Sequence, residues 1–327
     1  PLVATPNPGT TFTHWSGISV KTPYSPITTL TVTETGSATA NFQTGVYHLN
    51  ASSQTINQSG TILTQEGGTI TAGNSYAYGS KANIRARAFS GFEFVEWKVN
   101  KTINYQISVS KTLSSKGFFV IKGQDHPNLV LLRGYTYRFN LDGDSTLGNQ
   151  FYLSESPDSD APYAAGLTGG PADSGVISFK ITQSTPSKLY YGALGRAGFG
   201  NEIVIVDDDI RQNEHFQAKD ATTSVAMLAD KSVTAVFRIE SHSVSYDAIP
   251  SYGGTVSLAG DNPAEHGSSI ALTASPAPGF KFESWLGNDL STIDKKNPEL
   301  SIMLTSSQTV AARFIQIGEI ELTLKVT

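Results

Sequence analysis

The residue types that can carry chemistry in this chain of 327 residues are six histidines and several groups of carboxylates. The histidines are His14, His48, His126, His215, His242 and His266. They stand apart in the sequence, without the HxH or HExxH spacing of a metal site and without a GxSxG turn. We therefore interpret them as surface or strand-end residues, and we expect no catalytic residue and no bound metal.

Acidic residues gather in two stretches. They are Asp142, Asp144, Glu155, Asp158 and Asp160 in the first, and Asp207, Asp208 and Asp209 in the second. Oxygen-rich loops of this kind can bind calcium, but the spaced D-x-D-x-D-G pattern is missing, and solvated turns explain the residues more simply. Nothing places two carboxylates in a cleft, as glycoside hydrolysis requires. We expect a protein that has no cofactor and is not an enzyme, with calcium as the alternative.

The composition favours an all-β protein. Charged residues make up 16% of the chain, and Thr, Ser, Gly and aromatic residues are plentiful, which favours strands and turns over helices. Basic residues are scattered and the net charge is -5, so we expect no nucleic-acid partner. No apolar run reaches the about 20 residues that a membrane span needs. Cysteine is absent, which excludes disulfides and thiolate metal sites.

The elements that must position any functional residue are indicated by the three tryptophans. Each Trp stands six positions after a glycine and three after a phenylalanine, and another phenylalanine closes each copy. These residues are Phe12, Trp15 and Phe42, then Phe94, Trp97 and Phe237, then Phe282, Trp285 and Phe314. An aromatic residue at the same position of every copy favours a structural core over a ligand-stacking surface.

Two of the copies share a further strand upstream of the tryptophan. It begins as GGTIT at Gly67 and as GGTVS at Gly253, and a turn and an alternating strand follow. This combination resembles the divergent InlB B-type bacterial repeat, with its GGTVT start, its P-x-x-G-Y-x-F-x-x-W segment and its T-V-T-A-x-F end. The resemblance covers most of the chain outside the middle and implies tandem small β domains.

The second copy is interrupted. The step from Trp to closing Phe is 27 residues in the first copy and 29 in the third, but 140 in the second, from Trp97 to Phe237. About 110 extra residues are the size of an independent domain inserted in a loop. We predict residues 1–42 as the C-terminal part of repeat 1, 43–100 plus 220–239 as the split repeat 2, 101–219 as the insert, 240–317 as repeat 3 and 318–327 as the start of a following module.

Short alternating segments in the insert predict a β-sandwich. The stretches HPNLVLLRGYTYRFNLD, GVISFKIT and KLYYGALGRAGFGNEIVIV are similar to strands and the ligand loop of cupredoxins. In that family two His, one Cys and one Met bind copper. The matching positions here are Asn149, Ala193, Arg196 and Phe199. The resemblance therefore implies an inserted cupredoxin-like β-sandwich without the copper ligands.

The insert also carries PYAAGLTGG, with Tyr163, Gly166, Leu167 and Thr168, which is similar to a motif of phage structural and bacterial surface proteins. That resemblance implies an extracellular, virion or cell-surface location and a structural spacer, whose partners are other structural proteins or copies of itself. The alternative is an adhesin whose insert binds a host receptor or a glycan. A group of tyrosines either forms an exposed docking surface or packs on a sheet face, and the sequence does not separate the two. Those tyrosines are Tyr47, Tyr76, Tyr78, Tyr152 and Tyr163.

Overall fold

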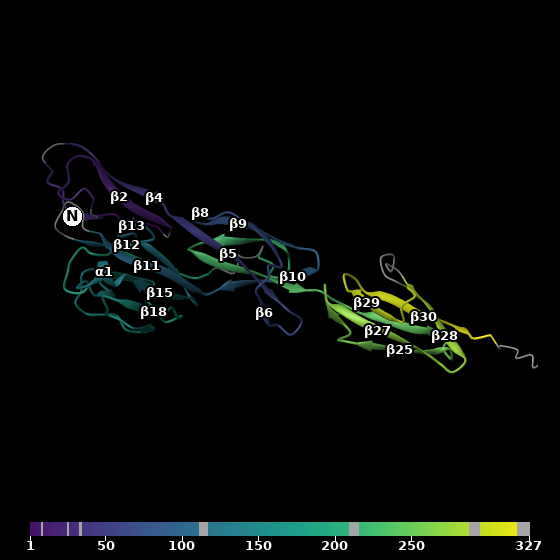
Figure 1. Cartoon of the computed structure of the whole chain (residues 1–327). Helices are drawn as coiled ribbons and strands as arrows, with labels where there is room; N and C mark the ends of the chain where they lie inside the picture. Colours follow the sequence, from purple (N-terminus) through teal and green to yellow (C-terminus); the bar gives the residue numbers. More distant parts are fainter. Residues whose placement is uncertain are drawn as a thin grey trace, which may run out of the picture. The chain divides into compact units, whose positions relative to one another are not determined.

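The computed structural model describes residues 1–7, 9–24, 26–32, 35–110, 117–208, 216–287 and 295–318. Apart from α1 (Gly143–Thr146), the regular elements of these residues are strands, so the chain is all-β, as the composition predicts (Figure 1). No helix in these ranges is long and apolar enough to cross a membrane. Of the module start predicted at 318–327, all but Gly318 lies outside the described residues.

The chain divides into two compact units. One consists of residues 1–52, 70–86 and 96–235, and the other of residues 53–69, 87–95 and 236–327. The first unit therefore holds repeat 1, the insert and part of repeat 2, and the second holds the rest of repeat 2 and repeat 3. The limits predicted above for the separate domains stay predictions.

Repeat 3 contains two facing three-stranded sheets, and β25, β27, β28, β29 and β30 are labelled at the green to yellow end of Figure 1. Its strands are β23 (Ser241–His242), β24 (Val244–Ile249), β25 (Gly254–Ala259), β26 (Ala264–Glu265), β27 (Ser269–Pro276), β28 (Phe280–Gly287), β29 (Glu299–Met303) and β30 (Gln308–Gln316). The sheets are β24-β30-β28 and β25-β27-β29. Alternation along β27 turns Ile270, Leu272 and Ala274 inward, against Trp285.

Repeat 1 contains β1 (Leu2–Val3), β2 (Thr10–Gly17), β3 (Ile27–Thr28) and β4 (Ala38–Thr44). Strands β2 and β4 pair antiparallel, with a register shift just after Phe12. The pair of β28 and β30 has the same shift just after Phe282, at the equivalent position of the repeat. A bulge sets the local twist of a strand pair. The bulge at equivalent positions therefore indicates that the two strand pairs have the same local geometry.

Repeat 2 is built around its closing strand. Its strands are β5 (Val46–Ile56), β6 (Ile62–Leu63), β7 (Gly68–Ala72), β8 (Ser75–Ala77), β9 (Ser80–Ala88), β10 (Phe92–Asn100), β21 (Thr222–Met227) and β22 (Lys231–Ile239). One sheet has the order β10-β22-β5-β6, with β8 also on β5, and another has the order β21-β9-β7. Strands from before and after the insert thus pair in the same sheets, β22 with β10 and β21 with β9.

The insert is a two-sheet sandwich, as its alternating segments predict. Its strands are β11 (Thr102–Ser110), β12 (Phe118–Ile121), β13 (Gln124–Asp125), β14 (Leu129–Leu132), β15 (Thr136–Leu141), β16 (Phe151–Ser154), β17 (Leu167–Thr168), β18 (Gly175–Lys180), β19 (Lys188–Ala193) and β20 (Glu202–Val206). One sheet has the order β13-β12-β11-β15-β18-β17 and the other β14-β20-β19-β16. Across the interior, the ring of Phe151 lies 5.1 Å from that of Phe119 and 5.0 Å from that of Phe139.

Candidate functional site

The four positions that match copper ligands lie beside β16 and β19. Ala193 ends β19, opposite the first residue of β16, and Asn149 stands just before β16. Arg196 is exposed, while Phe199 is buried with its ring 5.6 Å from that of Phe119. An amide, a methyl, a guanidinium and a phenyl group replace the imidazole, thiolate and thioether donors that copper requires. The absence of copper stays a prediction for metal analysis.

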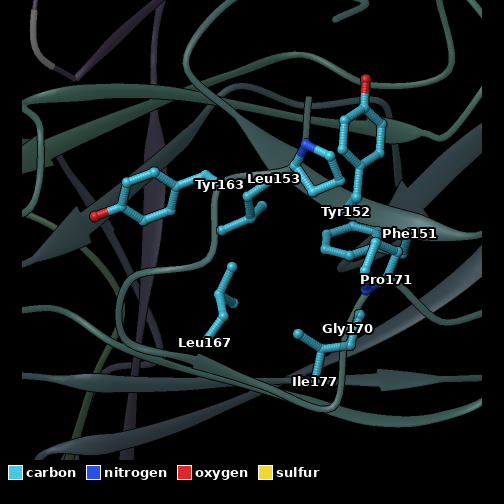
Figure 2. Close-up of a pocket in the computed structure, with 9 residues that line it drawn as sticks. Phe151, Tyr152, Leu153, Tyr163, Leu167, Gly170, Pro171 and Ile177 are labelled. Atoms are coloured by element: carbon cyan, nitrogen blue, oxygen red, sulfur yellow. The ribbon is translucent and has the colours of Figure 1, made fainter. Parts of the chain in front are cut away.

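The Y-x-x-G-L-T motif of the insert has a packing role. The N–H of Tyr163 donates to the carbonyl of Leu153 at 2.7 Å, and its ring meets that of Phe179 edge-on. Figure 2 shows Leu153, Tyr163 and Leu167 around a small apolar hollow. The volume of that hollow is about 10 Å³, which is room for about one water molecule. The motif therefore builds no ligand pocket at this place.

The tyrosines that suggest a docking surface are not exposed. Tyr47 and Tyr152 are buried, and Tyr76, Tyr78 and Tyr163 are half-buried. Of the two interpretations, the burial of these rings favours packing: Tyr47, for example, has its ring 5.9 Å from that of Tyr78. The expected exposure of Tyr47 and Tyr152 is wrong, because both side chains lie in the interior.

The repeated aromatic residues differ in burial from copy to copy. Phe12, Trp97, Phe237, Trp285 and Phe314 are buried, Trp15, Phe94 and Phe282 are half-buried, and Phe42 is 44% exposed. The buried tryptophans also find partners for their indole N–H groups. Trp97 donates to the carbonyl of Asp220 at 3.2 Å, and Trp285 donates to that of Asn297 at 2.9 Å.

The Gly-Gly-Thr start of the repeat packs against the closing phenylalanine in repeats 2 and 3. A Cβ atom added to Gly254 would lie 2.5 Å from the ring of Phe314, and one added to Gly68 would lie 2.5 Å from the ring of Phe237. The glycine backbone therefore covers the closing phenylalanine, and any side chain there would push it away.

A largely buried ion pair joins the insert to repeat 2. Lys122 lies in the turn between β12 and β13, and its Nζ atom is 2.6 Å from Oδ2 of Asp230, just before β22. The side chains are 23% and 9% exposed. The ammonium also lies 5.9 Å from the ring centre of Tyr47 and 5.8 Å from that of Tyr105. The other oxygen, Oδ1, accepts the N–H of His48 at 2.8 Å. Both rings and the carboxylate thus stabilise this cation.

Lys122 occupies a strained position in its turn. Its φ is 59° and that of Gly123 is 73°, so both residues of this two-residue turn are in the left-handed region. Asn-Gly is the preferred pair for such a turn, and a long side chain costs about 1 kcal/mol or more there. The ion pair with Asp230 gives a physical reason for a lysine at this place.

A second ion pair lies next to the first. Lys231 follows Asp230 in the chain, its side chain is 2% exposed, and its Nζ atom is 2.7 Å from Oδ1 of Asp208, just after β20. The Oδ2 atom of Asp208 accepts the hydroxyl of Tyr135 at 3.0 Å. A buried ammonium is stable only when a partner compensates its charge. Two consecutive residues of repeat 2, Asp230 and Lys231, therefore pair with two residues of opposite charge in the insert.

The phenols around these charges are neutral. Burial, and after it the carboxylate of Asp230, raises the pKa of Tyr105 well above its usual value. Burial and the neighbouring Asp208 carboxylate likewise raise the pKa of Tyr135. The hydroxyl of each ring therefore stays a hydrogen-bond donor over the physiological pH range.

A comparison of the copies shows from the sequence that the Asp-Lys pair occurs in repeat 2 and not in repeat 3, although it does not show what the pair contacts. Counted back from the closing phenylalanine, Asp230 and Lys231 correspond to Ser307 and Gln308 of repeat 3. The Oγ atom of Ser307 accepts the N–H of Ser243 at 3.1 Å, which is the bond that Asp230 makes in repeat 2. A neutral hydroxyl thus suffices for the repeat itself, and the charges belong to the repeat that carries the insert.

A polar cleft lies beside the ion pairs. Its volume is about 380 Å³, and its lining includes Asn50, Asn104 and Thr102, together with Lys122 and Asp230. Amide, hydroxyl and charged groups at a half-open cleft can bind a polar ligand by hydrogen bonds. This cleft is therefore a candidate binding surface.

The acidic stretches serve as local partners where they are described. Asp158 accepts the N–H of Gly198 at 2.8 Å, and Asp207 lies 3.4 Å from Nε of Arg133. Asp209 and His215 lie outside the described residues. Within the described ranges, the one group with three potential ligand atoms within 4.8 Å of one another is Glu240, His242 and His266. Calcium binding stays a prediction. His242 and His266, which are far apart in the sequence, lie close together in the structure.

The comparisons with solved structures give weak likenesses. Rusticyanin from Thiobacillus ferrooxidans is 18% identical and matches 33% of this chain and 79% of its own, with a TM-score of 0.22. Reduced rusticyanin is 17% identical, over 33% of this chain and 81% of its own, with the same TM-score of 0.22. A multicopper oxidase from Campylobacter jejuni is 13% identical, over 69% of this chain and 60% of its own, also with a TM-score of 0.22. The comparison with curated proteins finds no match.

The comparison with protein families is more informative. The model of the divergent InlB B-repeat domain matches residues 1–45, 60–119 and 245–318, which together are more than half of the chain. These ranges contain each of the three tryptophans and both Gly-Gly-Thr strands. The family model does not match residues 120–244, which include most of the sandwich. The chain belongs to the divergent InlB B-repeat family.

Proposed function

We propose that this chain is a non-enzymatic spacer segment of a modular appendage on a cell surface or a virion, with the insert held as a fixed part of repeat 2. Its partners are neighbouring structural proteins or further copies of the chain. The observation that carries the proposal is the double ion pair of Asp230 with Lys122 and of Lys231 with Asp208. Paired charges with little exposure define one orientation of the insert, because any other would leave a charge unpaired.

Short links support the same function. A single residue, Gly45, separates β4 from β5, and Glu240 alone separates β22 from β23. Lys101 alone separates β10 of repeat 2 from β11 of the insert. A linker of one residue restricts the orientation of one module relative to the next. A spacer requires this restriction, because a flexible linker would not hold its modules at fixed positions.

The test is nuclear magnetic resonance relaxation of backbone amides. In the unchanged chain, we expect the amides of the insert and those of repeat 2 in the first unit to report one common rotational correlation time. The matched variant is Asp230→Ser with Lys231→Gln, which installs the residues of repeat 3 and keeps a hydroxyl for the backbone bond. We expect the insert of this variant to show a shorter correlation time of its own. Separate correlation times in the unchanged chain would contradict the proposal.

A second candidate function is adhesion, and the polar cleft of about 380 Å³ is the observation that favours it. Asn50 and Asn104 are exposed on its wall and suit the hydroxyl groups of a glycan. A glycan array compares the unchanged chain with Asn50→Ala plus Asn104→Ala. Binding that the double variant loses supports adhesion. The absence of binding by the unchanged chain, or binding that the variant retains, excludes this cleft as the adhesive site.

A further inference from the structure

Consecutive repeats are joined by equivalent contacts at two places. In the first junction the N–H of Tyr78 donates to the carbonyl of Gly45 at 3.2 Å, and in the second that of His266 donates to Glu240 at 2.8 Å. Each of the two linking residues also donates its own N–H to the turn glycine six positions before the tryptophan, at 2.7 and 2.8 Å. The two junctions can therefore be compared residue by residue.

The side chains at these equivalent positions differ in chemistry. In the first junction Tyr47 and Tyr78 pack with ring centres 5.9 Å apart. In the second junction His242 and His266 occupy their places, with ring centres 5.3 Å apart. Glycine at the link is replaced by Glu240. Three positions thus change together, from groups that bind no metal at neutral pH to two imidazoles and a carboxylate.

The distances suit one small cation. The Nε2 atom of His242 lies 3.1 Å from Nδ1 of His266 and 3.7 Å from Oε2 of Glu240. Ligand atoms about 2.0–2.1 Å from a tetrahedral zinc ion lie about 3.3 Å from one another. Small side-chain movements are enough to place all three atoms around one ion.

The backbone holds the three residues in place. His242 pairs with Ala264 in the two-residue ladder of β23 and β26, and His266 follows β26 directly. The ring of His266 lies against the turn of repeat 2, where a Cβ atom added to Gly91 would be 2.3 Å from it. Ligands on an ordered backbone lose less entropy on binding a metal than ligands on a free loop.

We propose that Glu240, His242 and His266 bind one divalent transition-metal ion of the zinc class, with water as the remaining ligand. The nitrogens that face each other bind the metal through their lone pairs, so the ring hydrogens lie on Nδ1 of His242 and Nε2 of His266. The ion ties the link after β22 to the turn after β26 and stiffens the junction. The proposal goes beyond the spacer function and stands whether or not the insert is fixed.

Isothermal titration of the tag-free full chain with zinc chloride tests the proposal, and cobalt absorption reports the coordination geometry. We expect one zinc ion per chain and the intense visible bands of four-coordinate cobalt. His242→Tyr with His266→Tyr installs the aromatic pair of the first junction and should abolish both signals. Glu240→Gln should weaken binding by at least about tenfold, as expected for the loss of one charged ligand.

A gain-of-function variant guards against a folding artefact. Gly45→Glu, Tyr47→His and Tyr78→His transfer the three groups to the first junction, and the stoichiometry should rise from one zinc ion to two. Circular dichroism confirms that each variant is folded. The proposal is overturned if the unchanged chain binds no zinc at micromolar concentration. It is also overturned if the folded double-tyrosine variant binds as well as the unchanged chain, since other histidines would then hold the metal.

Discussion

The Oδ2 atom of Asp230 accepts a charged hydrogen bond from the Nζ atom of Lys122 at 2.6 Å. Its other oxygen makes the backbone bond that Ser307 makes in repeat 3 with a hydroxyl group. Replacing serine by aspartate at this position of a repeat therefore adds a second acceptor without giving up the first. That second acceptor binds the insert.

Removal of the lysine should destabilise the insert and its contact with repeat 2. Lys122→Met leaves Asp230 nearly buried without its cation, which should lower the free energy of unfolding by about 2–3 kcal/mol. Urea denaturation followed by tyrosine and tryptophan fluorescence measures the change. In the double variant with Asp230→Ser, most of this loss should disappear. Equal losses in the single and double variants would show that the ion pair is not the cause.

Lys231 should matter more than a surface lysine. With 2% of its side chain exposed, the ammonium is stable only opposite Asp208. Lys231→Gln leaves that carboxylate with the hydroxyl of Tyr135 and should cost about 2–4 kcal/mol. A matched control is Lys188→Gln, which removes a lysine that is 46% exposed and pairs with Glu202 at 2.8 Å, and which should cost at most about 1 kcal/mol. Similar losses for the two variants would argue against the buried pair.

Stability should fall steeply in alkaline solution. Burial raises the pKa of Tyr105, Tyr137 and Tyr191, so the folded chain keeps protons that the unfolded chain releases near pH 10. Above about pH 10 the unfolded state therefore binds fewer protons, and each such tyrosine lowers the unfolding free energy by about 1.4 kcal/mol per pH unit. Below that pH these groups add no pH dependence. Denaturation between about pH 9 and about pH 11.5 measures the slope.

Tyrosinate absorbance gives an independent check of that slope. Of the 13 tyrosines, the buried ones should titrate only as the chain unfolds. A native chain in which every tyrosine ionises near pH 10 would contradict the prediction.

Equivalent phenylalanines should differ in their contribution. Phe314 is 2% exposed beneath the glycine strand, and Phe314→Ala should cost about 3–5 kcal/mol. Phe42 is 44% exposed, and Phe42→Ala should cost about 1–2 kcal/mol, because much of its ring is already in water. Thermal unfolding of the two variants, each compared with the unchanged chain, tests the difference. A loss as large for Phe42 as for Phe314 would mean that the glycine strand is not what covers the ring.

Much of the fold is predictable from the sequence because its signals are local and repeated. Short alternating segments predict the β-sandwich of the insert, and the spacing from Trp97 to Phe237 predicts that the sandwich interrupts repeat 2. The side chains of Asn149, Ala193, Arg196 and Phe199 are also read directly from the sequence, and the interpretation of these positions as lost copper ligands stays a prediction. What cannot be predicted locally is the contact of Gly254 with the ring of Phe314, because the two residues lie far apart in the chain.

The sequence by itself determined the all-β class and the repeat family, because periodicity and spacing are properties of short segments. The tertiary structure alone decided that Lys122 meets Asp230 and that His242 meets His266. Both contacts join residues whose separation in the chain carries no information about their distance in space. Only sheet pairing, turn geometry and the closure of each small core bring such residues within bonding distance.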